Sequence, residues 1–185
     1  MINAVMYMEN SIDVIKSAIL GLAVADALGV PVEFSERENL DKNPVEDMIG
    51  YGTYNMPEGC WSDDTSMAIC ALDSLAGGYV DYNEIMKNFV DWCCYDKYTP
   101  TDYTFDMGNA CRTAIMKFKD NGISPLQCGG MTEASNGNGS LMRIIPFVLY
   151  HIYADSKKHF YRSYMMHQVL LMHICVQKWR AVYMQ

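Results

Sequence analysis

The segment Trp61–Met67 combines residue types and a spacing that suit chemistry. It reads Trp-Ser-Asp-Asp-Thr-Ser-Met, so a hydroxyl and two adjacent carboxylates precede an apolar run with helical spacing. We expect Ser62 at the N-cap and Asp63 and Asp64 in the first turn, where free N–H groups and the helix dipole keep carboxylates ionised. Ionised, clustered oxygen ligands suit a hard divalent cation. The same residues also form an ordinary helix cap, so the segment alone leaves both interpretations open.

Two more acidic residues stand among apolar neighbours earlier in the chain. Asp26 is the one charged residue in the apolar end of the first expected helix. Its side chain either faces solvent or bonds to a group that supports the residues of a site. Gly29 and Pro31 then end that helix, and Pro31 favours an extended chain before it. Glu33 follows in a short extended piece, either turned to water or held in a site.

The segment Asn136–Ser140, Asn-Gly-Asn-Gly-Ser, forms a flexible loop. It can turn several N–H groups toward one point ahead of a helix, which suits a phosphate or a sugar hydroxyl. Arg143 is expected in the first turn of that helix, where it opposes the dipole preference for acidic residues, and this small cost suggests another purpose. The alternative is a plain glycine loop capped by Ser140. Pro146 should kink or restart the helix.

The elements that would position these residues are all helices. Apolar residues recur at helical spacing in four segments, and no segment alternates convincingly as a strand, so the fold class is all-α. The polar stretch 35–59 is expected to be a long surface connection with room for one short helical turn, and connections of this length are usually functional or disordered. The expected helices run from Asn10 or Ser11 to Gly29, from Ser62 to Gly77, from Asp81 with Glu84 as a capping box, and from Met107 to Lys119.

Composition excludes several classes of protein. The 185 residues suit a single domain over 1–185, with half of them hydrophobic and 19% charged. The net charge of −8 and the lack of a basic cluster argue against a nucleic-acid partner. The seven cysteines form no C-x-x-C pair, which predicts buried thiols and a reducing compartment. No signal peptide is evident, and we predict a soluble cytoplasmic protein with no membrane partner.

Three stretches, taken in order, resemble the ADP-ribosylglycohydrolase family. They are Gly21–Phe34, Trp61–Met67 and Asn136–Arg143, and the similarity runs from about Ser11 to about His167. The resemblance implies an orthogonal all-α helical bundle that holds two metal ions, Mg²⁺ or Mn²⁺. It also implies hydrolysis that removes ADP-ribose from an ADP-ribosylated protein or from a small-molecule ADP-ribose conjugate.

The resemblance also implies roles for individual residues. The first-half metal ligands of the family fall on Ser62, Asp63 and Asp64, with Thr65 next to them, and Ser62 keeps the hydroxyl where the family has Thr. Asp63 and Asp64 would supply charge in catalysis, and Glu33 would activate water or gate the site. The expected ligand-binding residues are Ser135, Asn138, Gly139 and Ser140, and, with lower specificity, Gly108.

The chain departs from the family in its last part. The family completes its metal pair with a later Asp-x-Asp-Thr motif, whereas no Asp follows Asp155 here, and residues 169–185 form an atypical tail. We therefore expect an incomplete domain, truncated at the C-terminus by a shortened or shifted reading frame, with weakened metal binding and impaired hydrolysis. Two alternatives stay open, a catalytically silent ADP-ribose-binding fragment and a helical bundle without a ligand.

Overall fold

The computed structural model describes residues 2–130 and 137–153, with side chains from residue 12 onward. Ser135 and the tail 169–185 therefore lie outside the described residues. Within them every ordered element is a helix, which confirms the predicted all-α class. The elements are α1 (Ile2–Gly29), η1 (Val30–Val32), α2 (Arg37–Lys42), α3 (Asp63–Leu75), α4 (Tyr82–Tyr95), α5 (Asn109–Asn121), η2 (Pro125–Gln127) and α6 (Ile145–Tyr153).

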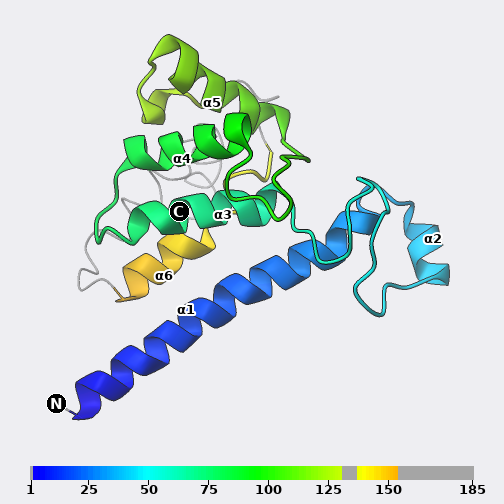
Figure 1. Ribbon diagram of the computed structural model, residues 1–185, viewed down its shortest axis with the longest axis horizontal. Coiled ribbons are helices and arrows are strands. Elements are labelled where there is room, and N and C mark those ends of the chain that lie inside the picture. The colour runs from blue at the N-terminus through cyan, green and yellow to red at the C-terminus, as the bar shows by residue number, and fades with distance from the viewer. Residues whose placement is uncertain (1, 131–136, 154–185) are drawn as a thin grey trace, which may run out of the picture.

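Helix α3 lies at the centre of the arrangement. It contacts α4 on one side and α6 and α1 on the other, and α5 packs on the far side of α4. Helix α1 crosses below this stack as a long rod whose N-terminal half extends beyond it (Figure 1). The N-terminal end of α3 therefore lies where α1, the connection after it and the loop before α5 come together.

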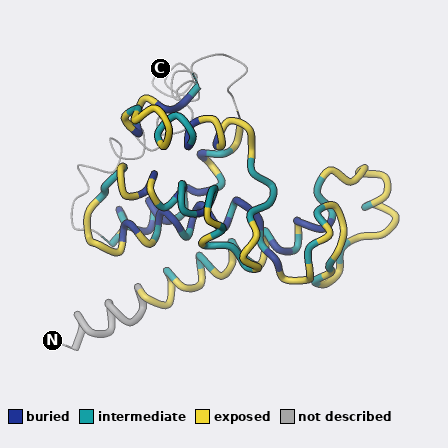
Figure 2. The backbone as a smooth tube through the Cα atoms, turned by 45° about the horizontal axis from the view of Figure 1, so that its top comes forward, coloured by how far each residue is buried: buried dark blue, intermediate teal, exposed yellow. Residues whose placement is uncertain are grey.

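The core consists of the apolar stripes expected from the helical spacing. Met67 and Ala71 of α3 pack with Ile85 and Phe89 of α4 and with residues of α5 and α6. These side chains are fully buried, and the dark segments of Figure 2 concentrate in α3 and α4. Burial of each large apolar side chain contributes about 1.5–3 kcal/mol. All six cysteines in the described residues are free, and four of them are buried, as predicted.

Local capping signals place some helix ends correctly and others wrongly. Asp81 caps α4 as predicted, since its carboxylate accepts hydrogen bonds from the N–H groups of Asn83 at 2.8 Å and Glu84 at 3.3 Å. The predicted start of the first helix at Asn10 or Ser11 is wrong, because α1 begins at Ile2. The helix-forming residues on both sides of Asn10 continue the helix through it, and a single cap signal does not outweigh them.

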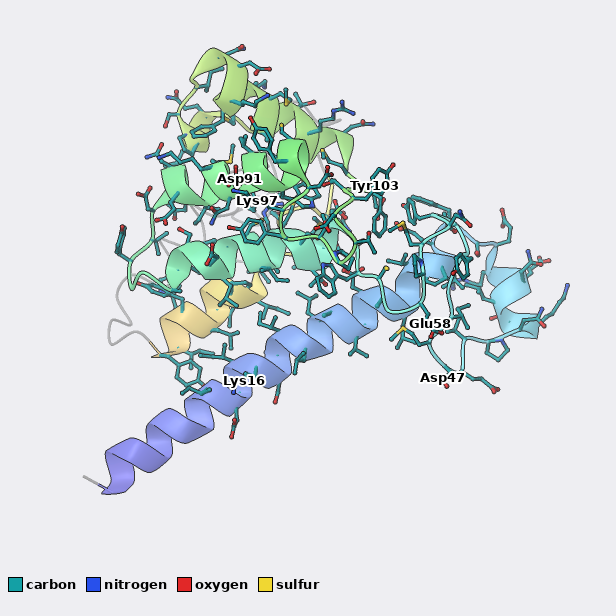
Figure 3. All side chains as sticks on the ribbon, viewed as in Figure 1. Lys16, Asp47, Glu58, Asp91, Lys97 and Tyr103 are labelled. Atoms are coloured by element: carbon teal, nitrogen blue, oxygen red, sulfur yellow. The ribbon has the colours of Figure 1, made fainter. Side chains whose placement is uncertain are left out.

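The connection between α2 and α3 packs against η1 and bonds to it. Val30–Val32 forms a 3-10 turn, so Val30 is not extended as expected, since Pro31 suits the first turn of such a helix. Glu33 directly after it has an extended backbone, with φ of −55° and ψ of 142°. Gly52 packs so closely on η1 that a Cβ there would lie 1.7 Å from the carbonyl oxygen of Pro31. Thr53 donates its N–H to that carbonyl at 2.9 Å. In Figure 3, Asp47 of this connection lies beyond the C-terminal end of α1.

The glycine loop does not open a helix directly. The N–H groups of Leu141 and Met142 bond to the carbonyl of Asn138, so a turn follows the loop, and α6 begins only at Ile145. Ser140 is therefore not the N-cap of α6, and Arg143 does not lie in its first turn. Pro146 restarts the helix because it lacks an N–H group and suits a first turn.

Part of α1 leaves apolar side chains in contact with solvent. Ile12, Leu20 and Val24 are each at least half exposed. The segment Ile12–Val32 is long and apolar enough to cross a membrane, with a mean hydropathy of 1.6 and 17% of it buried. Length and composition alone do not distinguish such a span from a helix of a soluble protein, and the absence of a membrane partner stays a prediction.

Two glycine substitutions should change stability in opposite directions. Gly52→Ala forces a Cβ against Pro31 and should lower the free energy of unfolding by about 1–3 kcal/mol. Gly21→Ala, in an open position of α1 with no atom within 4 Å of the added Cβ, should raise it by about 0.5–1 kcal/mol. Urea unfolding followed by circular dichroism measures both. Equal stability of the two variants would contradict the packing of Gly52 on η1.

Candidate active site

Asp26 of α1 binds the N-terminal turn of α3. Its Oδ1 accepts a hydrogen bond from the hydroxyl of Ser62 at 2.7 Å. Its Oδ2 accepts three, from the N–H of Ser62 at 3.0 Å and from the N–H and hydroxyl of Thr65 at 3.1 and 2.6 Å. The sequence left open whether this carboxylate faces solvent. The structure shows that it satisfies backbone groups at the start of α3 that have no partner within the helix.

The start of α3 agrees with the predicted cap. Ser62 is the N-cap, and its hydroxyl oxygen accepts the N–H of Asp64 at 3.3 Å. Asp63 and Asp64 occupy the first turn, as expected. Ser62, Asp63 and Thr65 are buried, whereas Asp64 is half-buried. The cap and the acidic site are therefore the same structure, and the two interpretations of this segment are compatible.

Burial and nearby carboxylates oppose ionisation of the two carboxylates at the start of α3, and they do so to different extents. Burial raises the pKa of Asp63 to about 8, the charges of Asp106 and Asp64 add to this, and a hydrogen bond from the backbone of Gly108 opposes it. Burial, then Asp26 and Asp106, raise the pKa of Asp64 to about 6. Near pH 7 the predicted ionised state is therefore wrong for Asp63 but holds for most of Asp64, because desolvation and repulsion between like charges shift the pKa of Asp63 further.

Glu33 and Asp106 approach this acidic pair from two loops. Tyr54 donates its hydroxyl to Asp106 Oδ1. Partial burial raises the pKa of Glu33, a hydrogen bond with Tyr54 opposes this shift, and the nearby carboxylates of Asp106 and Asp64 add to it. Burial and its two acidic neighbours also raise the pKa of Tyr54, so the phenol stays protonated and serves as a donor between two carboxyl groups.

The loop between α4 and α5 is braced so that Asp106 faces the cluster. Thr104 donates its N–H to the carboxylate of Asp96 and its hydroxyl to the carbonyl of Trp92, both at 2.8 Å. Asp106 has a left-handed backbone with φ of 56°, and the neighbouring Phe105 ring lies 5.3 Å from the Tyr54 ring, centroid to centroid. Sequence reasoning missed Asp106 and Tyr54. Their only local signal is their position in long, aromatic connections.

The donor groups at the start of α3 fit part of a divalent-cation site. Asp63 and Asp64 are hard oxygen donors whose pKa values are raised first by burial and then by neighbouring carboxylates, and a bound cation would offset that repulsion. The Ser62 hydroxyl donates its proton to Asp26 and keeps lone-pair density for a metal. Among residues 2–130 and 137–153, however, no three acidic, histidine or cysteine side chains are grouped to hold a metal ion by themselves.

The predicted ligand loop packs beside this cluster. A Cβ on Gly139 would lie 2.8 Å from the sulfur of Cys111 in α5. The carbonyl of Gly139 accepts a hydrogen bond from the buried Arg143. The predicted Gly108 is the N-cap residue of α5, and its backbone bonds to Asp63. The structure thus brings the described part of the loop and the acidic cluster to the same end of α3 and α5.

Comparison with known proteins identifies the family of this chain. The sequence model of the ADP-ribosylglycohydrolase family matches residues 8–177, which is most of the chain. The chain belongs to the ADP-ribosylglycohydrolase family. A solved chain described as an ADP-ribosylglycohydrolase-related protein complex superimposes with a TM-score of 0.66 at 30% sequence identity, covering 84% of this chain and 48% of that one.

Two curated relatives show the extent of the match. ADP-ribosylarginine hydrolase Tri1 of Pseudomonas putida (strain GB-1) is 36% identical over 143 residues, which are 77% of this chain and 37% of that protein. The ADP-ribosyl-[dinitrogen reductase] glycohydrolase of Rhodospirillum rubrum is 34% identical over 135 residues, 71% of this chain and 42% of that protein. The chain therefore spans about two fifths of the length of these relatives.

Replacement of Asp26 by Asn tests the anchor of α3. An amide group has one acceptor oxygen, so Asp26→Asn directs an NH₂ group at donors of Ser62 or Thr65 and leaves them unpaired. We expect a loss of about 2–3 kcal/mol in the free energy of unfolding, measured with urea. The matched control is Asp13→Asn, an exposed position on the same helix, which should leave stability unchanged within about 0.5 kcal/mol. Similar losses in both variants would contradict the anchoring role.

Proposed function

We propose that this chain supplies the acidic part of the active site of a metal-dependent ADP-ribosylglycohydrolase. The supporting observation is the convergence of Glu33, Asp63, Asp64 and Asp106 at a helix start that Asp26 holds from another helix. A cluster of like charges is costly and has no purpose in a structural helix cap. Family membership supplies the substrate class, since the relatives carry names of hydrolases acting on ADP-ribosylated arginine or dinitrogen reductase.

The reaction proposed is hydrolysis of the bond between the anomeric carbon of ADP-ribose and its acceptor, here an arginine side chain of a protein. Water adds to the anomeric carbon, the bond to the acceptor nitrogen breaks, and the acceptor leaves with a proton. The transition state has oxocarbenium character, which nearby carboxylates stabilise. Glu33 is the group placed to take the proton from water, because its raised pKa makes it a stronger base than an exposed carboxylate.

A divalent cation, Mg²⁺ or Mn²⁺, belongs to this proposal. Asp63, Asp64 and the Ser62 hydroxyl would hold it as part of a larger ligand set, because the described residues do not complete a metal site by themselves. When bound, it would add positive charge at the ribose and lower the pKa of a water molecule. Loss of the repulsion among the carboxylates would accompany its binding.

A second candidate function is binding of ADP-ribose without turnover. It rests on the different supports of the two parts of the site, since the described glycine loop packs on α5 through Gly139 while the described acidic residues do not complete a metal site by themselves. A chain with an intact loop and an unfinished metal site would retain the ligand and release no product. Calorimetry with ADP-ribose, with and without Mn²⁺, distinguishes the two, because binding that needs no metal and lacks turnover favours this candidate.

The acidic pair can be tested by double substitution. Asp63→Ala with Asp64→Ala should abolish release of ADP-ribose from an ADP-ribosylated arginine protein, measured by chromatography in the presence of Mn²⁺. Stability should be retained or raised, because removal of buried like charges relieves repulsion. The control is Asp120→Asn, an exposed acidic residue at the end of α5, which should release ADP-ribose at the normal rate. Unchanged release by the double variant would refute the proposed function.

Tyr54 gives a milder test of the same site. Tyr54→Phe removes the donor between Asp106 and Glu33 and should lower the rate of release about tenfold, the equivalent of one hydrogen bond to a charged group. Tyr51→Phe is the matched control, because Tyr51 is two-thirds exposed on the same connection. The steady-state rate of ADP-ribose release is measured for both variants. Equal rates would show that Tyr54 has no role in the reaction.

A further inference from the structure

Arg143 is a buried cation that the proposed reaction does not use. It is fully buried, and its guanidinium lies 5.5 Å from the centre of the Phe89 ring. Its Nη1 lies 3.9 Å from the sulfur of Met67 and 3.7 Å from that of Cys111. Burial of a guanidinium against thioether, thiol and aromatic groups is costly, so a structure that keeps it there gains something in return.

The one strong hydrogen bond of Arg143 goes to the glycine loop. Nη1 donates to the carbonyl oxygen of Gly139, and within the described part of the chain Nε and Nη2 have no hydrogen-bond partner. A charged donor in a low-dielectric setting makes a stronger bond than a neutral one. Gly139 is held from a second side as well, because its backbone lies so close to Cys111 that a Cβ would approach that sulfur to 2.8 Å.

This bond fixes the direction of a whole peptide unit. In a planar trans peptide the carbonyl of one residue and the N–H of the next point in opposite directions. With the carbonyl of Gly139 directed at the guanidinium, the N–H of Ser140 points away from it. The carbonyl is thus turned into the core. Ser140 is itself buried, so the bond acts by fixing the backbone of the loop, while Gly137 and Asn138 just before it stay exposed.

We propose that Arg143 is a positioning residue that holds the Gly139–Ser140 peptide with its carbonyl inward, so that the loop presents its exposed residues Gly137 and Asn138 to ADP-ribose in a fixed conformation. This inference rests on the proposed function for the identity of the ligand. It also accounts for a cation at a position where the sequence offered no reason for one.

The test compares Arg143→Met with Arg143→Lys in the full chain. Met suits a pocket lined by Met67, Cys111 and Phe89 but donates no hydrogen bond, whereas Lys retains a charged donor. Since Met removes an incompletely paired buried cation, the variant should fold with a thermal midpoint within about 4 °C of wild type. A merely structural role would instead lower the midpoint well beyond that range, and this result would overturn the inference.

The position of the loop is measured without any ligand. Cys111 lies under Gly139 and is 4% exposed, so its alkylation by N-ethylmaleimide, followed by peptide mass spectrometry, reports whether the loop is lifted. We expect alkylation of Cys111 to accelerate roughly ten- to a hundredfold in Arg143→Met, the equivalent of one charge-assisted hydrogen bond. It should stay within about threefold of wild type in Arg143→Lys. Cys70, fully buried in α3, is the internal control for global unfolding.

Binding of ADP-ribose, measured by calorimetry, completes the test. We expect Arg143→Met to weaken it by roughly the same factor as it accelerates Cys111 alkylation, and Arg143→Lys to restore it, with the affinity for Mn²⁺ alone unchanged in both. Unchanged alkylation and unchanged affinity in Arg143→Met overturn the inference. A wild-type chain that does not bind ADP-ribose overturns the proposed function and the identity of the ligand, while the alkylation rates still decide whether Arg143 holds the loop.

Discussion

The contact between Asp26 and the first turn of α3 is the interaction on which the site depends. One carboxylate accepts four hydrogen bonds, two from Ser62 and two from Thr65, and so joins α1 to the helix that lies at the centre of the fold. Without such a partner, the free N–H groups at this helix start would need water, and the side chains of the first turn would have more freedom. Because the bond network orients Ser62, it also sets the direction of Asp63 and Asp64.

Several carboxyl groups lie close together, and partly buried, next to the contact between Asp26 and α3. Burial and neighbouring carboxylates raise the pKa values of Asp63 and Asp64, and Glu33 and Asp106 add two more carboxyl groups from loops. Like-charged side chains stay this close together only when the backbone holds their residues in place. Here the Gly52 contact with Pro31 and the hydrogen bonds of Thr104 provide that constraint. Repulsion among carboxylates held this close together is typical of a site that binds a positively charged ligand.

The glycine loop is also held by a charged side chain, in this case a cation. A buried Arg143 holds one carbonyl of the loop from within the core, while Cys111 supports its backbone from α5. The acidic cluster and the glycine loop are therefore supported by two different charged side chains, the half-buried Asp26 and the fully buried Arg143. Asp26 accepts two backbone N–H groups and two hydroxyls, and Arg143 donates to one backbone carbonyl. In both cases the charge acts by fixing peptide geometry.

The sequence by itself determined the helical class, the core stripes and the motifs, because periodicity and capping chemistry are local. Ser62, Asp63 and Asp64 were identified from adjacent positions, and Glu33, Gly108 and the loop from their resemblance to a family. The helix start at Ile2 and the turn before Pro146 were missed, since competing local preferences decide such boundaries. Asp106 and Tyr54 also escaped notice, because they lie in irregular connections with no pattern of their own.

Only the tertiary structure decided the charge state and the contacts of these residues. A carboxylate at a helix start is expected to be ionised, but its pKa depends on burial and on neighbours from distant segments, and these raise it at Asp63 and Asp64. The sequence could not say whether Asp26 faced water or what Arg143 was for. Both answers depend on which backbone groups lie within reach, and that is settled when α1, α3 and the glycine loop pack together.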